Sequence, residues 1–373
     1  MDVIGDVALN RSLDQDEWAD RCIYWDNLVE ANKPKRMRRE RQSHPLIITG
    51  HGLSITVDKK RLVIKDGNTH YPSKPRVSEY FKGDLELPPR IVVVDGSGNI
   101  TLDALDWLAD QGVPLIRIKF DGTGTTVMSP SGFSADRTKV AWQLETRDDP
   151  DKKLEFAIRI TRQKLEASIE TLEKFVPSSK YLDRAIEAVR NDLAFIDRGE
   201  ADTPSKLLGQ EGKAASSYWR AWQGVQINWR ATARHPIPDD WQTYLSRSSI
   251  LTGVNPKNKN ASHPINAMLN YAYAALLTRT KIQAICDGYD PMIGILHDQR
   301  HKEKDLTPSF ALDLMEPQRP VVDRVILKLI AEETFSGADF DIQSNGVCRL
   351  NPELARTLAL STMKSVGGCN CEV

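Results

Sequence analysis

The sequence has no apolar run long enough to cross a membrane, and its acidic start lacks the basic and apolar regions of a signal peptide. Five scattered cysteines among 373 residues argue against a disulfide framework and favour reduced thiols. The net charge of −1 gives the whole chain no excess of basic groups. We therefore expect a soluble, cytoplasmic protein. Its overall charge does not by itself indicate that it binds nucleic acid.

Several common functional motifs are also missing. The chain contains no phosphate-binding P-loop, dinucleotide fingerprint, nucleophile elbow or kinase signature. Charge is concentrated locally in KPKRMRRER, residues 33–41, where six of nine positions are basic. Such a run is typical either of a solvated linker or of a flexible arm that contacts DNA phosphates.

The first part of the chain has the pattern of a β-rich domain. Short β-branched runs, LIIT, LSITV and RLVIK, are separated by the turn formers GHG, DKK and DGN, which predicts a small sheet of hairpins. A further strand, a Gly-rich turn and a helix follow, with Thr101 as the helix cap and Gly112 as its end. Another strand, VPLIRIKF, comes after the helix. We place this N-terminal domain at residues 46–130.

The rest of the chain is predicted to be helical. Apolar residues recur at spacings of three and four from residue 135 to residue 360, which predicts an all-α domain. Within it, residues 230–265 look like an irregular, exposed insertion. Residues 1–45 form an unassigned N-terminal extension, and residues 361–373 a flexible tail. The expected fold class is α+β, with a β-rich domain followed by a larger helical domain.

Glu211 is the first candidate site residue. On a helix it shares a face with Ala214, Ala215 and Tyr218. The two small alanine side chains would let another element or a ligand approach the Glu211 carboxylate closely. The alternative is a surface glutamate in the first turn of a helix, where the helix dipole favours negative charge.

His297, Asp313 and Glu316 form a second group. Thr307 and Pro308 resemble a helix start, so Asp313 and Glu316 would project from one side of that helix. The proline after Glu316 disfavours helical conformation there and predicts that the helix ends or kinks. A single histidine such as His297 is otherwise more often structural than a ligand.

Two or three carboxylates and one imidazole suit magnesium or manganese, whose preferred ligands are oxygens, with nitrogen tolerated by manganese. Zinc fits less well, because no Cys/His ligand spacing is present. A metal ion with open coordination positions would support phosphoryl chemistry, since it neutralises charge on phosphorus and activates a water or hydroxyl nucleophile.

Three stretches resemble the CRISPR-associated integrase family of spacer acquisition, over the range Leu46 to Leu360. They are GQEGKAASSYW, HPINAMLNYAYAALL and GILHDQRHKEKDLTPSFALDLMEPQRPVVD. The resemblance implies that Glu211, His297 and Glu316 are the metal ligands and that Asp313 is an adjacent active-site carboxylate. The family's architecture is also β-rich followed by helical.

The resemblance further implies a prokaryotic homodimer that acts on double-stranded and branched DNA, often bridged by a small ferredoxin-like partner. The implied reaction is attack by a 3′-hydroxyl of short DNA on a phosphodiester at the edge of a CRISPR repeat. A casposase-like transposase and a non-catalytic DNA-binding scaffold remain as alternatives. Four arginines that flank the ligands are candidates either for phosphate contacts or for structural ion pairs: Arg220, Arg230, Arg319 and Arg324.

Overall fold

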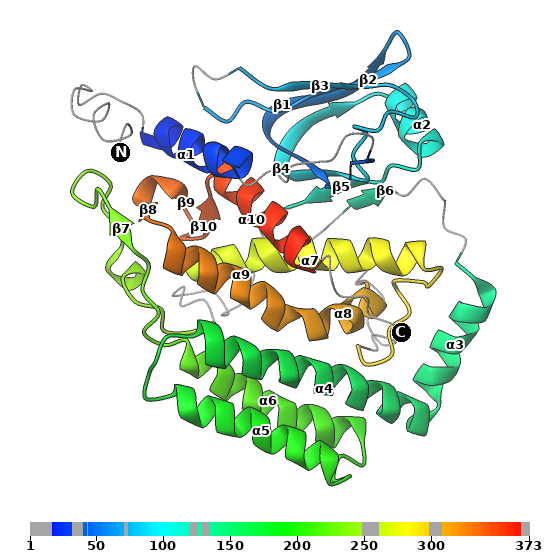
Figure 1. Cartoon of the computed structure of the whole chain (residues 1–373), viewed down its shortest axis with the longest axis vertical. Coiled ribbons are helices and arrows are strands. Elements are labelled where there is room, and N and C mark those ends of the chain that lie inside the picture. Colours follow the sequence, from blue (N-terminus) through cyan, green and yellow to red (C-terminus); the bar gives the residue numbers. More distant parts are fainter. Residues whose placement is uncertain are drawn as a thin grey trace.

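A computed structural model of the chain describes residues 17–31, 40–42, 44–70, 74–119, 126–128, 135–247, 261–297 and 308–366. A strand-rich part lies at one end of the molecule and a larger helical part makes up the rest (Figure 1). This arrangement confirms the predicted α+β class. Among the described residues, no helix combines the length and apolar content that a membrane crossing needs. Cys22, Cys286 and Cys348 carry free thiols.

The main sheet has the strand order β3-β2-β1-β4-β5-β6. Its strands are β1 (Leu46–Asp58), β2 (Arg61–Lys65), β3 (Val77–Tyr80), β4 (Ile91–Ile100), β5 (Leu115–Ile118) and β6 (Thr126–Met128). Strands β1, β4 and β5 run parallel, and the other pairs are antiparallel. The prediction of a hairpin sheet was therefore wrong for its centre. Parallel neighbours need a long connection, and helix α2 (Leu102–Asp110) supplies it between β4 and β5.

The segment GHG, predicted as a turn, lies inside β1. Gly50 and Gly52 have φ values of 88° and 75°, and the register with β4 shifts on both sides of His51. A Cβ atom on Gly50 would lie 2.7 Å from the backbone oxygen of Asn68. The glycines therefore permit a bulged strand and a close approach of two backbones, rather than a reversal of the chain.

Both faces of the sheet are buried, and neighbouring residues on a strand point to opposite cores. Ile48 and Val93 belong to the core beneath α2, whereas Ile47 and Val92 belong to the core shared with the helical part. Helices α7 (Pro264–Cys286) and α10 (Pro352–Ser365) contact the sheet on that second side. Burial on both faces explains the continuous apolar run of β4, which is typical of a central parallel strand.

Helix α2 begins and ends as predicted. The Thr101 hydroxyl accepts a hydrogen bond from the Ala104 backbone N–H at 3.3 Å, which caps the first turn. Gly112 follows the helix with a φ of 68°, a conformation that glycine adopts without strain.

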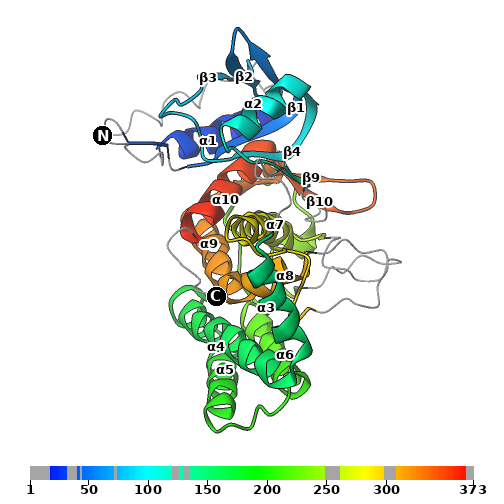
Figure 2. The same cartoon turned by 90° about the vertical axis from the view of Figure 1, so that its right-hand side faces the viewer.

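The helical part continues from α3 to α10. Its remaining elements are α3 (Arg137–Asp148), α4 (Pro150–Phe175), α5 (Leu182–Asp197), α6 (Pro204–Ala221), α8 (Ser309–Met315) and α9 (Arg319–Glu332). Figure 2 shows α7, α9 and α10 between the sheet and the group formed by α4, α5 and α6. Helix α7 is buried nearly all round, as a central helix must be. Helix α10 continues to Ser365, so the tail predicted from residue 361 begins too early.

The stretch predicted as an exposed insertion at 230–265 is partly packed. Strand β7 (Trp229–Arg230) pairs with β8 (Phe335–Ser336), and the Trp241 ring stacks on Trp229 at a centroid distance of 6.0 Å. Trp241 and Tyr244 are 3% and 0% exposed. The aromatic side chains therefore anchor this stretch to the helical core, while residues 248–260 lie outside the described range.

The unassigned extension contains helix α1 (Glu17–Ala31), which lies beside α10 (Figure 1). Arg21 donates two hydrogen bonds to the fully buried carboxylate of Asp339, at 2.7 and 2.9 Å. The Trp25 indole N–H donates a third to the same carboxylate at 2.7 Å. A buried carboxylate with these partners fixes α1 to the turn before strand β9 (Phe340–Ile342).

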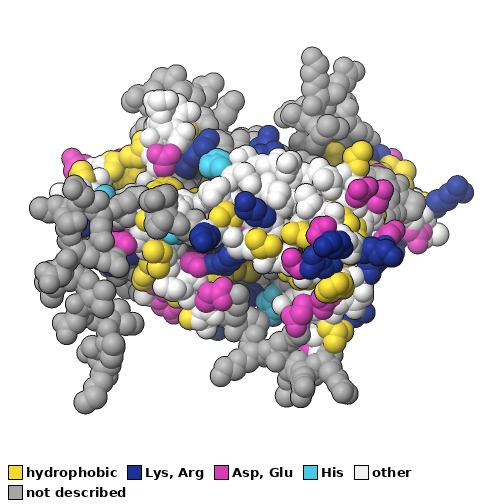
Figure 3. Space-filling model, turned by 90° about the horizontal axis from the view of Figure 1, so that it is seen from above, with side chains coloured by type: hydrophobic (Ala, Val, Ile, Leu, Met, Phe, Trp, Pro, Cys, Tyr) yellow, Lys and Arg dark blue, Asp and Glu magenta, His cyan; other side chains and the backbone are white. Residues whose placement is uncertain are grey.

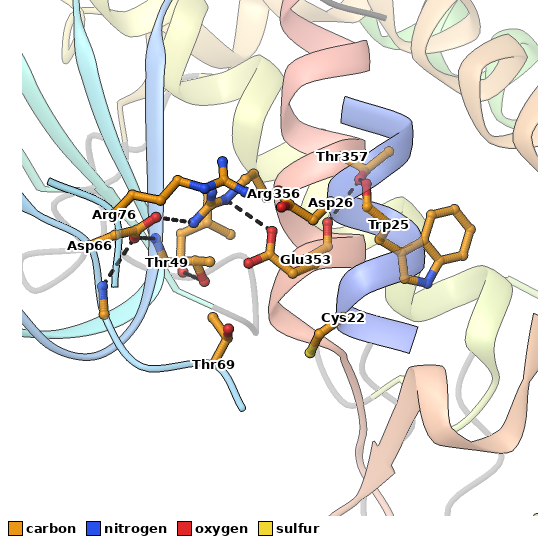
Figure 4. Close-up of polar contacts among 12 residues, drawn as sticks. Cys22, Trp25, Asp26, Thr49, Asp66, Thr69, Arg76, Glu353, Arg356 and Thr357 are labelled. Carbon is orange, nitrogen blue, oxygen red and sulfur yellow. Dashed lines mark hydrogen bonds and ion pairs between the residues drawn. The ribbon is translucent and has the colours of Figure 1, made fainter. Parts of the chain in front are cut away.

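A buried polar cluster joins the sheet to α10 (Figure 4). Arg356 donates to the Asp66 carboxylate and forms an ion pair with Glu353 at 3.3 Å, while Asp66 also accepts from the Thr49 backbone N–H at 2.8 Å. These contacts hold the two parts of the fold together. Seen from above, the molecule shows basic and acidic side chains intermixed (Figure 3). Most of the basic run predicted at residues 33–41 lies outside the described residues.

Candidate functional site

The predicted site residues come from three separate elements. Glu211 lies in the middle of α6, so it is not the first-turn glutamate of the alternative interpretation. His297 follows a loop after α7, and Asp313 lies in α8. Helix α8 ends at Met315, and Glu316 opens a 3-10 turn, Glu316–Gln318, before α9 begins. The predicted break at the proline is confirmed, and it places Glu316 at the junction between α8 and α9.

A lysine that the sequence interpretation missed joins the two glutamates. The Lys164 ammonium on α4 lies 2.8 Å from Glu211 Oε1 and 2.7 Å from Glu316 Oε2. All three side chains are largely buried, with exposed fractions of 22%, 16% and 11%. The Glu211 carboxylate from α6 and the Glu316 carboxylate from the α8–α9 junction therefore both form an ion pair with the Lys164 ammonium.

Lys164 has a signal in the sequence that can be read once the inward face of its helix is known. Helical residues four apart lie on one face, and Lys164 occupies the central position of such a row. The row's other members are all buried: Phe156, Ile160, Ser168 and Leu172. A lysine inside an inward-facing row predicts a buried acidic partner, because an isolated ammonium is costly to bury.

Asp313 lies behind His297 and holds the segment that carries it. The carboxylate is fully buried and accepts hydrogen bonds from the backbone N–H groups of Ile295, Leu296 and His297, at 2.6, 3.1 and 3.0 Å. Its Oδ1 also lies 2.7 Å from His297 Nδ1. These contacts occupy both carboxylate oxygens. Asp313 is therefore placed to orient the imidazole, not to face the space between the two glutamates.

The other ring nitrogen of His297 points towards Glu316. His297 Nε2 lies 3.9 Å from Glu316 Oε1, and Arg319 Nη2 lies 3.0 Å from the same oxygen. Glu316 is thus the meeting point of an imidazole, a guanidinium and an ammonium. The structure links Glu211 to Glu316 through Lys164 and places the His297 imidazole beside Glu316.

These charges perturb ionisation in the site. Burial by itself would raise the pKa of Glu316, but the nearby Arg319 and Lys164 outweigh it and hold that pKa below its usual range. Burial would lower the pKa of Lys164, yet Glu316 and Glu211 reverse the effect and raise it. Both side chains are therefore charged at neutral pH, and a negatively charged glutamate is what a cation ligand requires.

A cavity of about 150 Å³ opens beside Lys164 and Glu211. Its wall includes Asp323, which is buried and accepts hydrogen bonds from the hydroxyl groups of Tyr218, at 2.7 Å, and Tyr273. Burial raises the pKa of Asp323 to about 6, although both tyrosines favour its ionised form. This cluster packs α6, α7 and α9 together directly under the site.

Among the described residues, no three His, Cys, Asp or Glu side chains stand close enough to hold a metal ion as they are arranged. The position of the Lys164 ammonium between the two carboxylates explains this spacing. Magnesium ligands lie at about 2.0–2.1 Å, so the carboxylates would have to close by roughly 0.7 Å each around an ion. The donor set itself, two carboxylates and one imidazole, fits manganese or magnesium.

The four candidate arginines have different surroundings. Arg319 lines the cavity at the site. Arg324 is held by α4, where it contacts Glu170 at 2.7 Å and donates to the Ala167 carbonyl at 2.8 Å. Arg220 and Arg230 are exposed. The contacts of Arg324 correspond to the structural alternative.

A family profile described as CRISPR associated protein Cas1 matches residues 46–362. A CRISPR-associated endonuclease Cas1 of Archaeoglobus fulgidus is 26% identical, covering 86% of this chain and 87% of that protein. One from Thermus thermophilus is 25% identical, covering 82% and 81%.

Solved structures share the fold. A Cas1 protein from Thermotoga maritima has a TM-score of 0.60 at 18% identity, covering 87% of this chain and 91% of that one. A casposase bound to an integration product has a TM-score of 0.65 at 24% identity, covering 87% and 82%. The family match spans both the sheet and the helical part, including every predicted site residue. The chain therefore belongs to the CRISPR-associated Cas1 family.

Proposed function

We propose that the chain is a divalent-metal-dependent DNA endonuclease and integrase that joins 3′-hydroxyl ends of short DNA to a CRISPR repeat array. Membership of the Cas1 family supplies the activity class, an endonuclease and integrase of spacer acquisition. One observation supports the assignment of the metal-binding residues: Glu211 and Glu316 both contact the Lys164 ammonium, and the His297 imidazole lies beside Glu316.

Glu211, His297 and Glu316 would hold the magnesium or manganese ion. When bound, such an ion stabilises negative charge on the phosphodiester and acidifies a water or hydroxyl nucleophile. Asp313 prepares the imidazole for this role. Because its Oδ1 faces Nδ1, the proton of a neutral imidazole is held on Nδ1 and the Nε2 lone pair faces Glu316.

In the joining reaction, the incoming 3′-oxygen forms a bond to phosphorus while the bond from phosphorus to the neighbouring 3′-oxygen breaks. The proton lost by the attacking hydroxyl is balanced by the proton gained by the departing one, so the number of phosphodiester bonds is unchanged. With water as the nucleophile, the same exchange is hydrolysis. The Arg319 guanidinium, beside Glu316, supplies positive charge towards a bound phosphate.

The proposed substrates are double-stranded and branched DNA, including CRISPR repeat DNA. We expect Arg319 to contact the reacting strand and the exposed Arg220 and Arg230 to contact flanking phosphates. We further propose a homodimer and a small ferredoxin-like partner. A solved assembly described as a Cas6-RT-Cas1–Cas2 complex shares this fold, with a TM-score of 0.65, and supports a partner subunit.

Two alternatives are less well supported. The likeness to a casposase is one of fold, whereas the curated relatives that cover most of the chain are CRISPR-associated endonucleases. A non-catalytic scaffold would not need the charged groups of the site, whose burial is costly unless they serve a purpose. A repeat array in the neighbouring genes would favour the integrase over the transposase.

The test is joining of a labelled short duplex to a plasmid that carries a repeat, in magnesium or manganese. Replacing Glu211, His297 or Glu316 by alanine should each lower the joining rate by at least about a thousandfold, because each would remove a ligand of one ion. The exposed Glu187→Ala change on α5 is the matched control and should leave joining unaffected. Joining retained in all three variants would refute the site assignment.

A further inference from the structure

Lys164 occupies the position that a cation needs in this site. Its ammonium makes two short contacts, to Glu211 Oε1 at 2.8 Å and to Glu316 Oε2 at 2.7 Å. Hydrogen bonds between charged partners are the strong ones, and the low exposure of all three side chains protects them from solvent screening. The two carboxylates therefore already share one positive charge that the chain itself supplies.

An ammonium and a divalent ion cannot both use these oxygens. A carboxylate oxygen lies closer to a magnesium or manganese ion that it binds than these oxygens lie to the Lys164 nitrogen. An ion bound to the same oxygens would also be repelled by the nearby ammonium. Arg319 does not replace the lysine, because its ion pair, at 3.0 Å, is with Glu316 and does not bridge to Glu211 among the contacts described. A single side chain thus bridges the pair, and its flexible four-carbon stem allows the ammonium to leave.

We propose that Lys164 is a resident counter-cation of the site, whose ammonium competes with the divalent ion for Glu211 and Glu316. In the metal-free chain it keeps the two carboxylates together and stabilises the packing of α4 against α6 and the α8–α9 junction. It must withdraw before an ion can take both oxygens. This inference rests on the proposed function, because it takes Glu211 and Glu316 as metal ligands.

The competition predicts two opposite effects of one substitution. Lys164→Met keeps the length of the side chain and removes its charge, so the metal-free protein should melt at a lower temperature in EDTA. The same variant should bind Mn²⁺ at least about tenfold more tightly, since an ion no longer has to displace a charge-assisted hydrogen bond. Added Mn²⁺ should therefore raise the melting temperature more in the variant than in the unchanged protein.

The experiment measures Mn²⁺ binding to the full chain by electron paramagnetic resonance, and melting with EDTA or Mn²⁺. Lys174→Met is the matched control, because Lys174 is on the same helix, is exposed and pairs only with Glu170 among the contacts described. Its Mn²⁺ affinity should equal that of the unchanged protein. Lys164→Arg retains the positive charge and should bind Mn²⁺ no more tightly than the unchanged protein.

The outcomes separate this inference from the proposed function. If the unchanged protein binds Mn²⁺ and Glu211→Gln abolishes binding, the metal assignment stands. Equal or weaker binding by Lys164→Met would then overturn the competition alone. Tighter binding by Lys164→Arg would also overturn it, and this variant decides the question if Lys164→Met does not fold. Absence of Glu211-dependent binding in the unchanged protein would overturn both proposals.

Discussion

Replacing Asp313 by asparagine tests whether this carboxylate holds the segment that carries His297. Oδ2 accepts from the backbone N–H groups of Ile295 and Leu296, and Oδ1 accepts from the His297 backbone and faces its ring. An amide keeps only one acceptor oxygen, so two of these contacts are lost whichever way the side chain points. At about 1.5–3 kcal/mol for each hydrogen bond to a charged group, the variant should be destabilised by about 3–6 kcal/mol.

The Asp313→Asn change should also lower the metal affinity and the joining rate. Without a carboxylate at its Nδ1, the imidazole loses the partner that fixes its proton and its orientation, which typically costs about 10–100-fold in metal affinity or activity. Hydrogen exchange should accelerate at the amides of residues 295–297, and the joining rate should fall. Asp183→Asn, at an exposed position on α5, is the control. Unchanged exchange at these three amides together with a normal joining rate would refute the argument.

Two further predictions concern buried groups outside the site. Arg21→Met should lower the free energy of unfolding by roughly 3–5 kcal/mol in urea, because it leaves the buried Asp339 charge without its cation. The more exposed Arg61, which pairs with Glu79, should cost about 1 kcal/mol or less when changed to Met, and equal losses would contradict the first prediction. Burial lowers the pKa of His263 to about 4, so on acidification the unfolded chain takes up a proton from about pH 6.5 while the folded chain does not. Stability should therefore fall between about pH 6.5 and 4, by up to about 3 kcal/mol from this group. His263→Asn keeps an acceptor for the Ile265 N–H and should flatten that part of the pH profile; an unchanged slope would count against the assignment.

The sequence could single out residues that the structure places near one another, because their types and their order reflect the chemistry they can perform. Pro317 predicted the helix break at Glu316, because a proline disfavours helical conformation in the residue before it. The cap of α2 at Thr101 could be predicted because it depends only on a local hydrogen bond. The metal-ligand roles of Glu211, His297 and Glu316 stay predictions, as does the identity of the ion. The family and the fold class are confirmed.

Other features depend on contacts between distant parts of the chain, which local patterns do not record. The parallel pairing of β1 with β4 could not be told from hairpin pairing, because a short apolar run fits either. The GHG glycines looked like a turn, but their role depends on the backbone near Asn68 that approaches them. The buried position of Lys164 could be recognised only once the structure showed that its face of α4 points inward.

The docking of α1 has a consequence for how the chain reaches its folded state. Arg21 and its partner Asp339 are 318 residues apart. At the usual rates of ribosomal synthesis, α1 waits roughly 16–64 s before the turn that receives it has been made. During that interval the Asp339 carboxylate and the Phe335 ring, which Trp25 contacts in the folded protein, have not yet been synthesised. Helix α1 can therefore dock only late, after the chain has been synthesised as far as Asp339.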